Sequence, residues 1–162
     1  DWSPAAFVVV FRKNQGTIEF LLPEERRMLL RDNEGVQGQV SIRNIPQGLV
    51  KTWQAATPEQ AALRETKEET GLDPIAITGL GNIYFDAANS ETAMPFFMAE
   101  VPFEGLTYDQ SLDETEHIEV SESDWYALED IPKLKLECAK TLSGIMLATG
   151  FLGLWPSQSP QK

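Results

Sequence analysis

Apolar and polar positions divide the first third of the chain into short segments with strand-like patterns. Residues 5–12 are apolar and rich in β-branched side chains, which predicts a buried strand. A turn signal at residues 14–16 and partial alternation over residues 17–22 predict a second strand, paired with the first as a hairpin. Residues 39–45 predict another short strand. The charged segment over residues 23–38 predicts a long loop or an irregular strand extension.

A helix over residues 58–70 has the clearest boundaries in the chain. Thr57 suits the N-cap, Pro58 suits the first helical position, and Gln60 completes a capping box with Thr57. The interior consists largely of strong helix formers. Gly71 suits the left-handed residue that ends a helix. Local sequence therefore predicts both ends of this helix.

The rest of the chain predicts further strands and a second helix. Apolar residues at helical spacing predict that helix over residues 134–149. Strands are expected over residues 75–85, 92–101 and 118–125. The loops between them cover residues 86–91 and 102–116. The order of strands, helix, strands and helix predicts an α/β fold, in which a mixed β-sheet packs between helices as an α/β/α sandwich. We expect a single domain over residues 1–155 and a flexible tail over residues 156–162.

The charge of the chain limits its partners. It carries 25 acidic and 13 basic residues, a formal net charge of −12, which argues against binding a nucleic-acid polymer. Small phosphorylated substrates are not excluded, because carboxylates recruit Mg²⁺ or Mn²⁺, which in turn bind phosphates. No apolar run approaches the roughly 20 residues of a membrane span. With no signal-peptide pattern and only one cysteine, Cys138, the expected compartment is a reducing cytoplasm.

Three carboxylates lie on one face of the predicted helix. Glu65, Glu68 and Glu69 fall within an arc of roughly 100° at 3.6 residues per turn. Arg64 can pair with Glu68, but one guanidinium does not neutralise three acids. Periodicity alone favours a solvated acidic surface, since runs of charge are usually exposed. The alternative is a face that binds hard divalent cations through oxygen ligands.

The spacing of these residues decides between the two interpretations. The segment from Arg64 to Leu72 resembles the second half of the Nudix box, Arg-Glu-U-x-Glu-Glu-x-Gly-U, where U is bulky and aliphatic. Residues 45–48 are similar to the Pro-x-Gly entry of the box, and residues 61–65 also resemble the usual sequence of the family. The resemblance implies a Nudix hydrolase with the α/β/α sandwich of that family.

The chain departs from the family pattern at three points. Thr66 stands at an aliphatic position and slightly weakens the expected packing of the helix on the sheet. Ala56 stands where the first glutamate of the box belongs. Gly48 lies sixteen residues before Arg64 instead of fourteen, so the loop over residues 49–56 is two residues longer. These departures affect metal geometry, substrate choice or both.

The resemblance also implies roles for individual residues. Glu65 and Glu69 are the expected direct metal ligands, Glu68 is a ligand or positions a water, and the Gly48 carbonyl completes the coordination. Arg64 is expected to orient a box carboxylate through a salt bridge. Mg²⁺ or Mn²⁺ then assists attack of water on a diphosphate linkage, without a protein nucleophile.

Substrate choice is predicted less sharply. An acidic loop resembles that of the ADP-ribose and nucleotide-sugar pyrophosphatase branch, which makes Glu116 the candidate general base or extra ligand, with Glu114 second. Trp53 is a candidate for stacking on a base or ribose, and Glu91 for contacting the substrate. A surface loop and a loop tryptophan covering the core are the simpler alternatives. That branch often carries a motif with proline after the box, but no proline occurs here between Pro74 and Pro95, which weakens the ADP-ribose assignment.

Three further residues have simple structural explanations. Trp125 is expected in the core, Cys138 as a small core residue on the apolar face of the last helix, and His117 on the surface. Three functions stay open. They are a hydrolase of ADP-ribose, nucleotide sugars, dinucleoside polyphosphates or nucleoside triphosphates, a non-catalytic nucleotide-sensing Nudix domain, and an acidic interaction module. The resemblance also leaves a homodimer open.

Overall fold

Strand β1 is the centre of the main sheet. The computed structural model describes residues 5–29, 38–50, 57–84, 92–106 and 120–155. Its strands and α-helices are β1 (Ala5–Asn14), β2 (Thr17–Leu21), β3 (Glu24–Leu29), β4 (Gly38–Arg43), β5 (Gln47–Leu49), α1 (Pro58–Thr70), β6 (Ala76–Ile83), β7 (Met94–Glu100), β8 (Trp125–Ala127) and α2 (Ala139–Phe151). Two short 3₁₀ helices, η2 (Glu122–Asp124) and η3 (Ile131–Lys133), lie on either side of β8 along the chain.

The main sheet is mixed, with the order β6-β7-β1-β2-β8. One edge of β1 pairs in parallel with β7. The other edge is shared, because the first residues of β1 pair antiparallel with β5 and its last residues pair antiparallel with β2. This division places the short strand β5 beside the beginning of β1, and β5 is where the predicted entry to the acidic helix lies.

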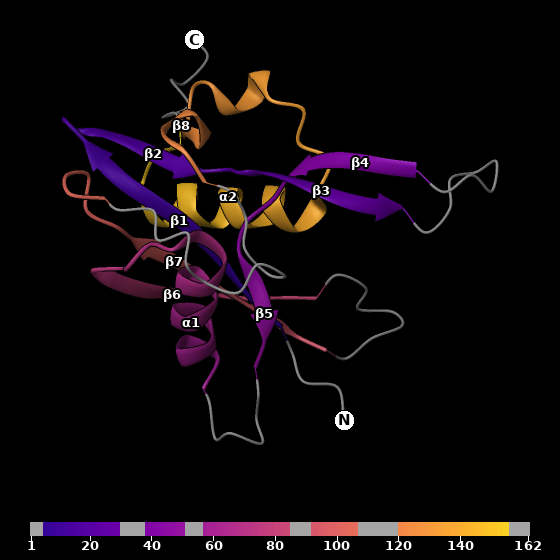
Figure 1. Cartoon of the computed structure of the whole chain (residues 1–162). Coiled ribbons are helices and arrows are strands. Elements are labelled where there is room, and N and C mark those ends of the chain that lie inside the picture. The colour runs from indigo at the N-terminus through magenta and orange to yellow at the C-terminus, as the bar shows by residue number, and fades with distance from the viewer. Residues whose placement is uncertain (1–4, 30–37, 51–56, 85–91, 107–119, 156–162) are drawn as a thin grey trace, which may run out of the picture.

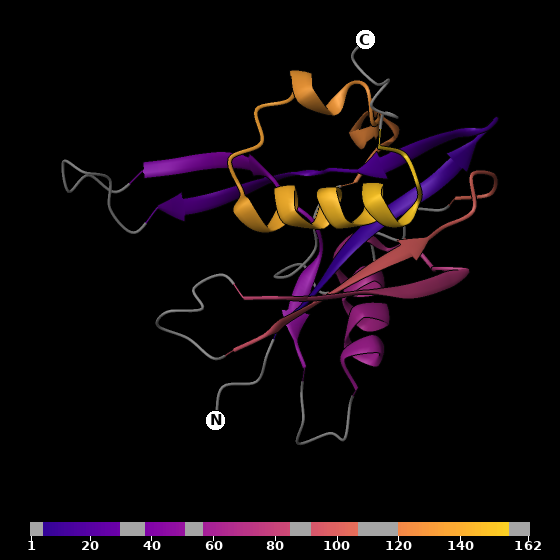
Figure 2. The same cartoon turned by 180° about the vertical axis from the view of Figure 1, so that it is seen from behind.

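The two helices cover opposite faces of this sheet (Figures 1 and 2). Side chains of β1 are buried on both faces, and successive residues of a strand point to opposite sides. The even-numbered residues Ala6, Val8 and Val10 share a cluster with Ala61 and Ala62 of α1. The odd-numbered residues Phe7, Val9 and Phe11 share a second cluster with Ile145 and Ala148 of α2. The predicted α/β/α sandwich is confirmed.

Several local predictions are confirmed as well. Helix α1 covers the predicted residues 58–70 with Thr57 as its N-cap and Gly71 as its C-cap. The strand expected over residues 75–85 is present as β6, with a register shift between Gly79 and Gly81. No helix among the described residues is long and apolar enough to cross a membrane.

Other local predictions need correction. Of the two alternatives for residues 23–38, a long loop or an irregular strand extension, the structure has a strand, β3, and it pairs with β4 in a separate hairpin (Figure 1). Strand β8 begins only at Trp125, because Asp124 accepts a hydrogen bond from the Ser121 N–H and turns the chain into η2 first. Helix α2 begins at Ala139 instead of residue 134, since Leu134 and Cys138 both have extended backbone conformations.

Candidate active site

Helix α1 is held at both ends by local hydrogen bonds. The Gln60 N–H donates to Thr57 Oγ1 at 3.2 Å, and the Thr57 N–H donates to Gln60 Oε1 at 2.8 Å. At the other end Gly71 has φ of 70°, and its N–H donates to the Lys67 carbonyl at 2.8 Å. One backbone N–H of the first turn and one carbonyl of the last turn are thereby paired within the segment. Because the helix is regular and capped at both ends, the direction in which each glutamate of the acidic face leaves the helix is fixed.

The carboxylate of Glu65 lies against the backbone of β5. Glu65 is only 7% exposed, which is unusual for a glutamate. A methyl group at Gly48 would lie 1.8 Å from Cδ of Glu65, far inside van der Waals contact. A side chain at position 48 would therefore displace the Glu65 carboxylate, and the Pro-x-Gly entry and the acidic helix meet here.

Arg64 connects this carboxylate to its neighbours. Its Nη2 donates to Glu65 Oε1 at 2.5 Å and to the Leu49 carbonyl at 2.9 Å. Its Nε lies 3.4 Å from Glu68 Oε2, so the ion pair expected between these two residues is present. Burial lowers the pKa of Arg64, but the hydrogen bond and charge of Glu65, together with Glu68, outweigh it and raise the pKa overall. One guanidinium thus holds two of the three box carboxylates.

The third carboxylate, Glu69, is held by a backbone group. The Gln47 N–H donates to Glu69 Oε2 at 3.0 Å. Glu65 and Glu69 therefore both contact β5 from one face of α1, while the side chain of Glu68 is 39% exposed. The predicted acidic face exists, and it is directed at the strand that carries Gly48.

The buried face of α1 tolerates the polar residue at the aliphatic position of the box. Thr66 is fully buried, and its hydroxyl donates to the Ala62 carbonyl at 2.8 Å. Thr70, one turn later, donates to the Thr66 carbonyl. Both hydroxyls are satisfied inside the helix, so burying them does not leave an unpaired polar group.

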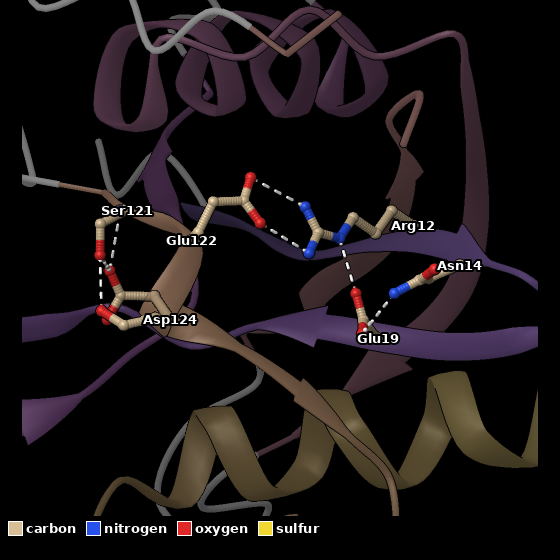
Figure 3. Close-up of polar contacts among 7 residues, drawn as sticks. Arg12, Asn14, Glu19, Ser121, Glu122 and Asp124 are labelled. Atoms are coloured by element: carbon tan, nitrogen blue, oxygen red, sulfur yellow. Dashed lines mark hydrogen bonds and ion pairs between the residues drawn. The ribbon is translucent and has the colours of Figure 1, made fainter. Parts of the chain in front are cut away.

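A second arginine cluster lies at the other end of β1 (Figure 3). Arg12 is 4% exposed, and its Nε donates to Glu19 Oε2 at 2.7 Å. Its Nη1 and Nη2 donate to the two carboxylate oxygens of Glu122 at 3.1 and 2.9 Å. The guanidinium carbon lies 4.9 Å from the ring centroid of Phe103 and 4.3 Å from that of Trp125. The prediction that Trp125 is a core residue is confirmed, since it is 8% exposed.

Known proteins place this fold and motif in one family. The family model for the NUDIX domain matches residues 2–143. The chain belongs to the Nudix family. Membership confirms the predicted family and supports the predicted enzyme class, a pyrophosphohydrolase. No curated protein matches the chain.

Solved structures agree with this Nudix assignment at the level of the fold. The C. elegans Ap4A hydrolase is 23% identical with a TM-score of 0.54, over 94% of this chain and 99% of that one. The NUDIX domain of Shewanella oneidensis NrtR, complexed with ADP ribose, is 20% identical with a TM-score of 0.60, over 94% and 89%. An ADP compounds hydrolase is 18% identical with a TM-score of 0.61, over 92% and 73%.

The donors of the acidic face suit a hard divalent cation. Nudix hydrolases generally use divalent metal ions. Glu65, Glu68, Glu69 and the Gly48 carbonyl offer only oxygen atoms, which Mg²⁺ and Mn²⁺ prefer. Within the described ranges, no three Asp, Glu, His or Cys side chains gather closely enough to hold a metal ion. Mg²⁺ is commonly bound through one or two carboxylates plus waters and substrate phosphates, so the residues present fit it without such a cage.

Several predicted site residues lie outside the described part of the chain. They are Trp53, Glu91, Glu114 and Glu116, together with Ala56 and His117. The structure therefore brings together Gly48, Arg64, Glu65, Glu68 and Glu69 and is silent on the loop residues.

Residues of α2 that support the box entry were not predicted from the sequence. Asn44 is 2% exposed, and its Oδ1 accepts from Thr141 Oγ1 at 3.1 Å. Cys138 donates to the same oxygen at 3.5 Å and stands at the N-cap of α2, half-buried, so the prediction of a core cysteine is wrong. Lys140 donates to Gln47 Oε1 at 3.2 Å. These contacts join residues more than 90 positions apart, and no local pattern announces them.

Proposed function

We propose that this Nudix protein hydrolyses a diphosphate linkage in a nucleoside diphosphate derivative, with ADP-ribose or a nucleotide sugar as the leading substrate and Mg²⁺ or Mn²⁺ as the cofactor. The observation that carries the proposal is the contact of α1 with β5. There Glu65 lies against Gly48, and Glu69 accepts a hydrogen bond from the Gln47 N–H. In a solvated acidic surface the glutamates would be exposed, whereas Glu65 is buried against a glycine.

The proposed reaction moves one proton and breaks one bond. A water oxygen attacks one phosphorus of the diphosphate, the bridging P–O bond breaks, and its electron pair leaves with the second phosphate. The water proton passes to a carboxylate, for which Glu116 is the proposed acceptor. Glu65, Glu68, Glu69 and the Gly48 carbonyl would hold the metal, which when bound polarises phosphate oxygens and favours attack by water.

The other residues of the site orient these groups. The Arg64 guanidinium holds Glu65 and Glu68 by ion pairs and is itself tied to the Leu49 carbonyl, so it is a positioning residue. The Gln47 N–H holds one oxygen of Glu69. Pre-oriented carboxylates reduce the cost of assembling the site when the substrate arrives.

The proposed substrate class is supported by the ligands of the neighbours. The S. oneidensis NUDIX domain is complexed with ADP ribose, and another neighbour is an ADP compounds hydrolase. Trp53, Glu91 and Glu114 are proposed to contact the nucleotide. The chain's net charge of −12 argues against a nucleic-acid polymer as substrate. A cytoplasmic location is proposed with this function.

Replacement of Glu69 tests the proposal. The protein is assayed with Mg²⁺ against ADP-ribose, nucleotide sugars, dinucleoside polyphosphates and nucleoside triphosphates. Glu69→Gln is expected to lower kcat at least ~100-fold on the best substrate, because a charged metal ligand becomes neutral. Glu59→Gln, in the exposed first turn of the same helix, is the matched control and is expected to keep full activity. Undiminished turnover by Glu69→Gln would overturn the metal-ligand assignment.

Two other functions have specific support. The likeness to the C. elegans Ap4A hydrolase favours a dinucleoside polyphosphate as substrate. Ala56, in place of the first box glutamate, favours a domain that binds nucleotides without turnover. The same substrate panel separates the first, and nucleotide binding without phosphate release on any substrate identifies the second.

A further inference from the structure

Lys140, in the first turn of α2, differs from the other basic residues whose side chains the structure describes. Seven of these side chains pair with a carboxylate within 4 Å: Arg12, Lys13, Arg43, Arg64, Lys67, Lys133 and Lys135. Lys140 is the exception in this group, since its contacts are with a neutral amide and an aromatic ring. In a chain with almost twice as many acids as bases, an ammonium with no acidic partner among the described residues calls for an explanation.

The contacts that Lys140 makes within the described part of the chain hold its position and carry no negative charge. Nζ donates to Gln47 Oε1 at 3.2 Å and lies 5.0 Å from the ring centroid of Phe7. Phe7 is itself fixed by burial and by stacking on Phe96, with the ring centroids 5.0 Å apart. The ring and the amide contribute attraction but no formal negative charge. The ammonium is therefore held in place for an anion without being neutralised.

Gln47 places this charge beside the acidic face. Its side chain accepts from Lys140, and its backbone N–H donates to Glu69. Its chain neighbour Gly48 is the residue against which Glu65 lies. Lys140 thus reaches the box entry from α2, on the face of the sheet opposite α1, which carries the glutamates (Figures 1 and 2).

Helix α2 is a firm support for this lysine. Its Thr141 hydroxyl donates to the buried Asn44 at the box entry. Further along, Gly144 lies so close to the sheet that a methyl group there would be 2.9 Å from Ile45 Cδ1 and 2.9 Å from Val9 Cγ2. The backbone position of a side chain in the first turn of such a helix is fixed, and binding residues work best on rigid elements.

We propose that Lys140 binds a phosphate oxygen of the substrate at the box entry and is a substrate-binding residue of this site. The inference rests on the proposed function. On binding, the phosphate oxygen replaces the Gln47 amide as the acceptor of Nζ, and a charge-assisted hydrogen bond replaces a weaker one to a neutral group. The ammonium also offsets repulsion between the phosphates and the three glutamates. The alternative is a structural lysine that covers Phe7.

Steady-state kinetics of Lys140→Met separate these two roles. Methionine keeps the length and the ring contact of the side chain and removes the charge. We expect KM to rise about tenfold, the loss of one hydrogen bond to a charged group, with kcat within about twofold of the wild type. Lys140→Arg, which keeps the charge, is expected to restore most of the affinity. Lys133→Met removes the same charge from an exposed pair and is expected to leave KM unchanged.

A binding measurement separates failure of this inference from failure of the proposed function. ADP is titrated into wild type and Lys140→Met by calorimetry, with Mg²⁺ present. Weaker binding of about tenfold in the variant supports the phosphate contact, whether or not any substrate is hydrolysed. Equal ADP affinity in the two folded proteins overturns the contact even if the enzyme is active. A fall in thermal stability with KM and ADP affinity unchanged identifies a structural lysine and also overturns it.

Discussion

Two arginine clusters lie at opposite ends of β1. Both pair a guanidinium with glutamates, but they have different roles. Arg12 and Arg64 each pair with two glutamates, and in each the surroundings raise the guanidinium pKa. Arg12 is enclosed, with a side chain 5% exposed between two aromatic rings, whereas the side chain of Arg64 is 24% exposed. The first cluster is closed by its own packing. The second faces β5 and leaves carboxylates in excess of cations.

The origin of the acids explains the difference. Glu19 and Glu122 reach Arg12 from β2 and η2, the latter 110 residues away, so the Arg12 cluster joins distant parts of the fold. The acids around Arg64 come from its own helix, and a third, Glu69, is held by a backbone N–H. A cluster that joins distant segments contributes to stability, while one built on a single helix face presents charge to a ligand.

Loss of Arg12 is expected to give the largest effect on stability. Arg12→Met leaves Glu19 part-buried without its cation and removes the guanidinium from between Phe103 and Trp125. We expect the free energy of unfolding to fall by about 3 kcal/mol, the lower part of the range for breaking a buried pair, since Glu122 is exposed to solvent. Urea unfolding measures it, and Lys133→Met is the control. A loss below ~1 kcal/mol would show that the enclosed cluster is not a stability element.

An added methyl group at Gly48 is expected to lower turnover strongly and stability only slightly, the reverse of the effect expected at Arg12. In Gly48→Ala the methyl group meets the far end of the flexible Glu65 side chain, so the carboxylate moves and the backbone does not. We expect kcat to fall about 30-fold, with a loss of stability under ~1 kcal/mol, because one oriented carboxylate is displaced. Gly79→Ala, whose methyl would meet Phe97 at 3.9 Å, is the control. Retained kcat would mean that the contact between Glu65 and Gly48 has no part in turnover.

The smallest effect is expected from alkaline pH. The pKa of Arg12 is raised: burial lowers it, but the hydrogen bonds and charges of Glu122 and Glu19 outweigh burial. A raised folded-state pKa gives a contribution to stability that is complete below the pKa of the unfolded state and is lost only as pH rises through the folded-state pKa. The difference in unfolding free energy between wild type and Arg12→Met should therefore stay constant from about pH 7 to 10. A difference that shrinks over this range would place the titrating group elsewhere.

Local sequence predicted the parts of the fold whose interactions are local. The caps of α1 are i, i+3 contacts, and the acidic face follows from helical period alone. Strand β4 was predicted, but its pairing with β3 was missed, because the charged residues of β3 lack the alternation that marks a strand. The start of α2 was placed too early, since apolar spacing does not reveal that the chain is still extended at Leu134 and Cys138.

The sequence by itself determined that this chain carries a capped acidic helix with Nudix spacing, because the residues responsible lie within one segment from Thr57 to Leu72. Only the tertiary structure decided what that helix faces. Gly48 meets Glu65, Gln47 connects Glu69 to Lys140, and Arg12 joins β2 to η2, each through contacts between side chains or strands distant in the chain. Such contacts depend on how the sheet and helices pack, and no local period encodes them.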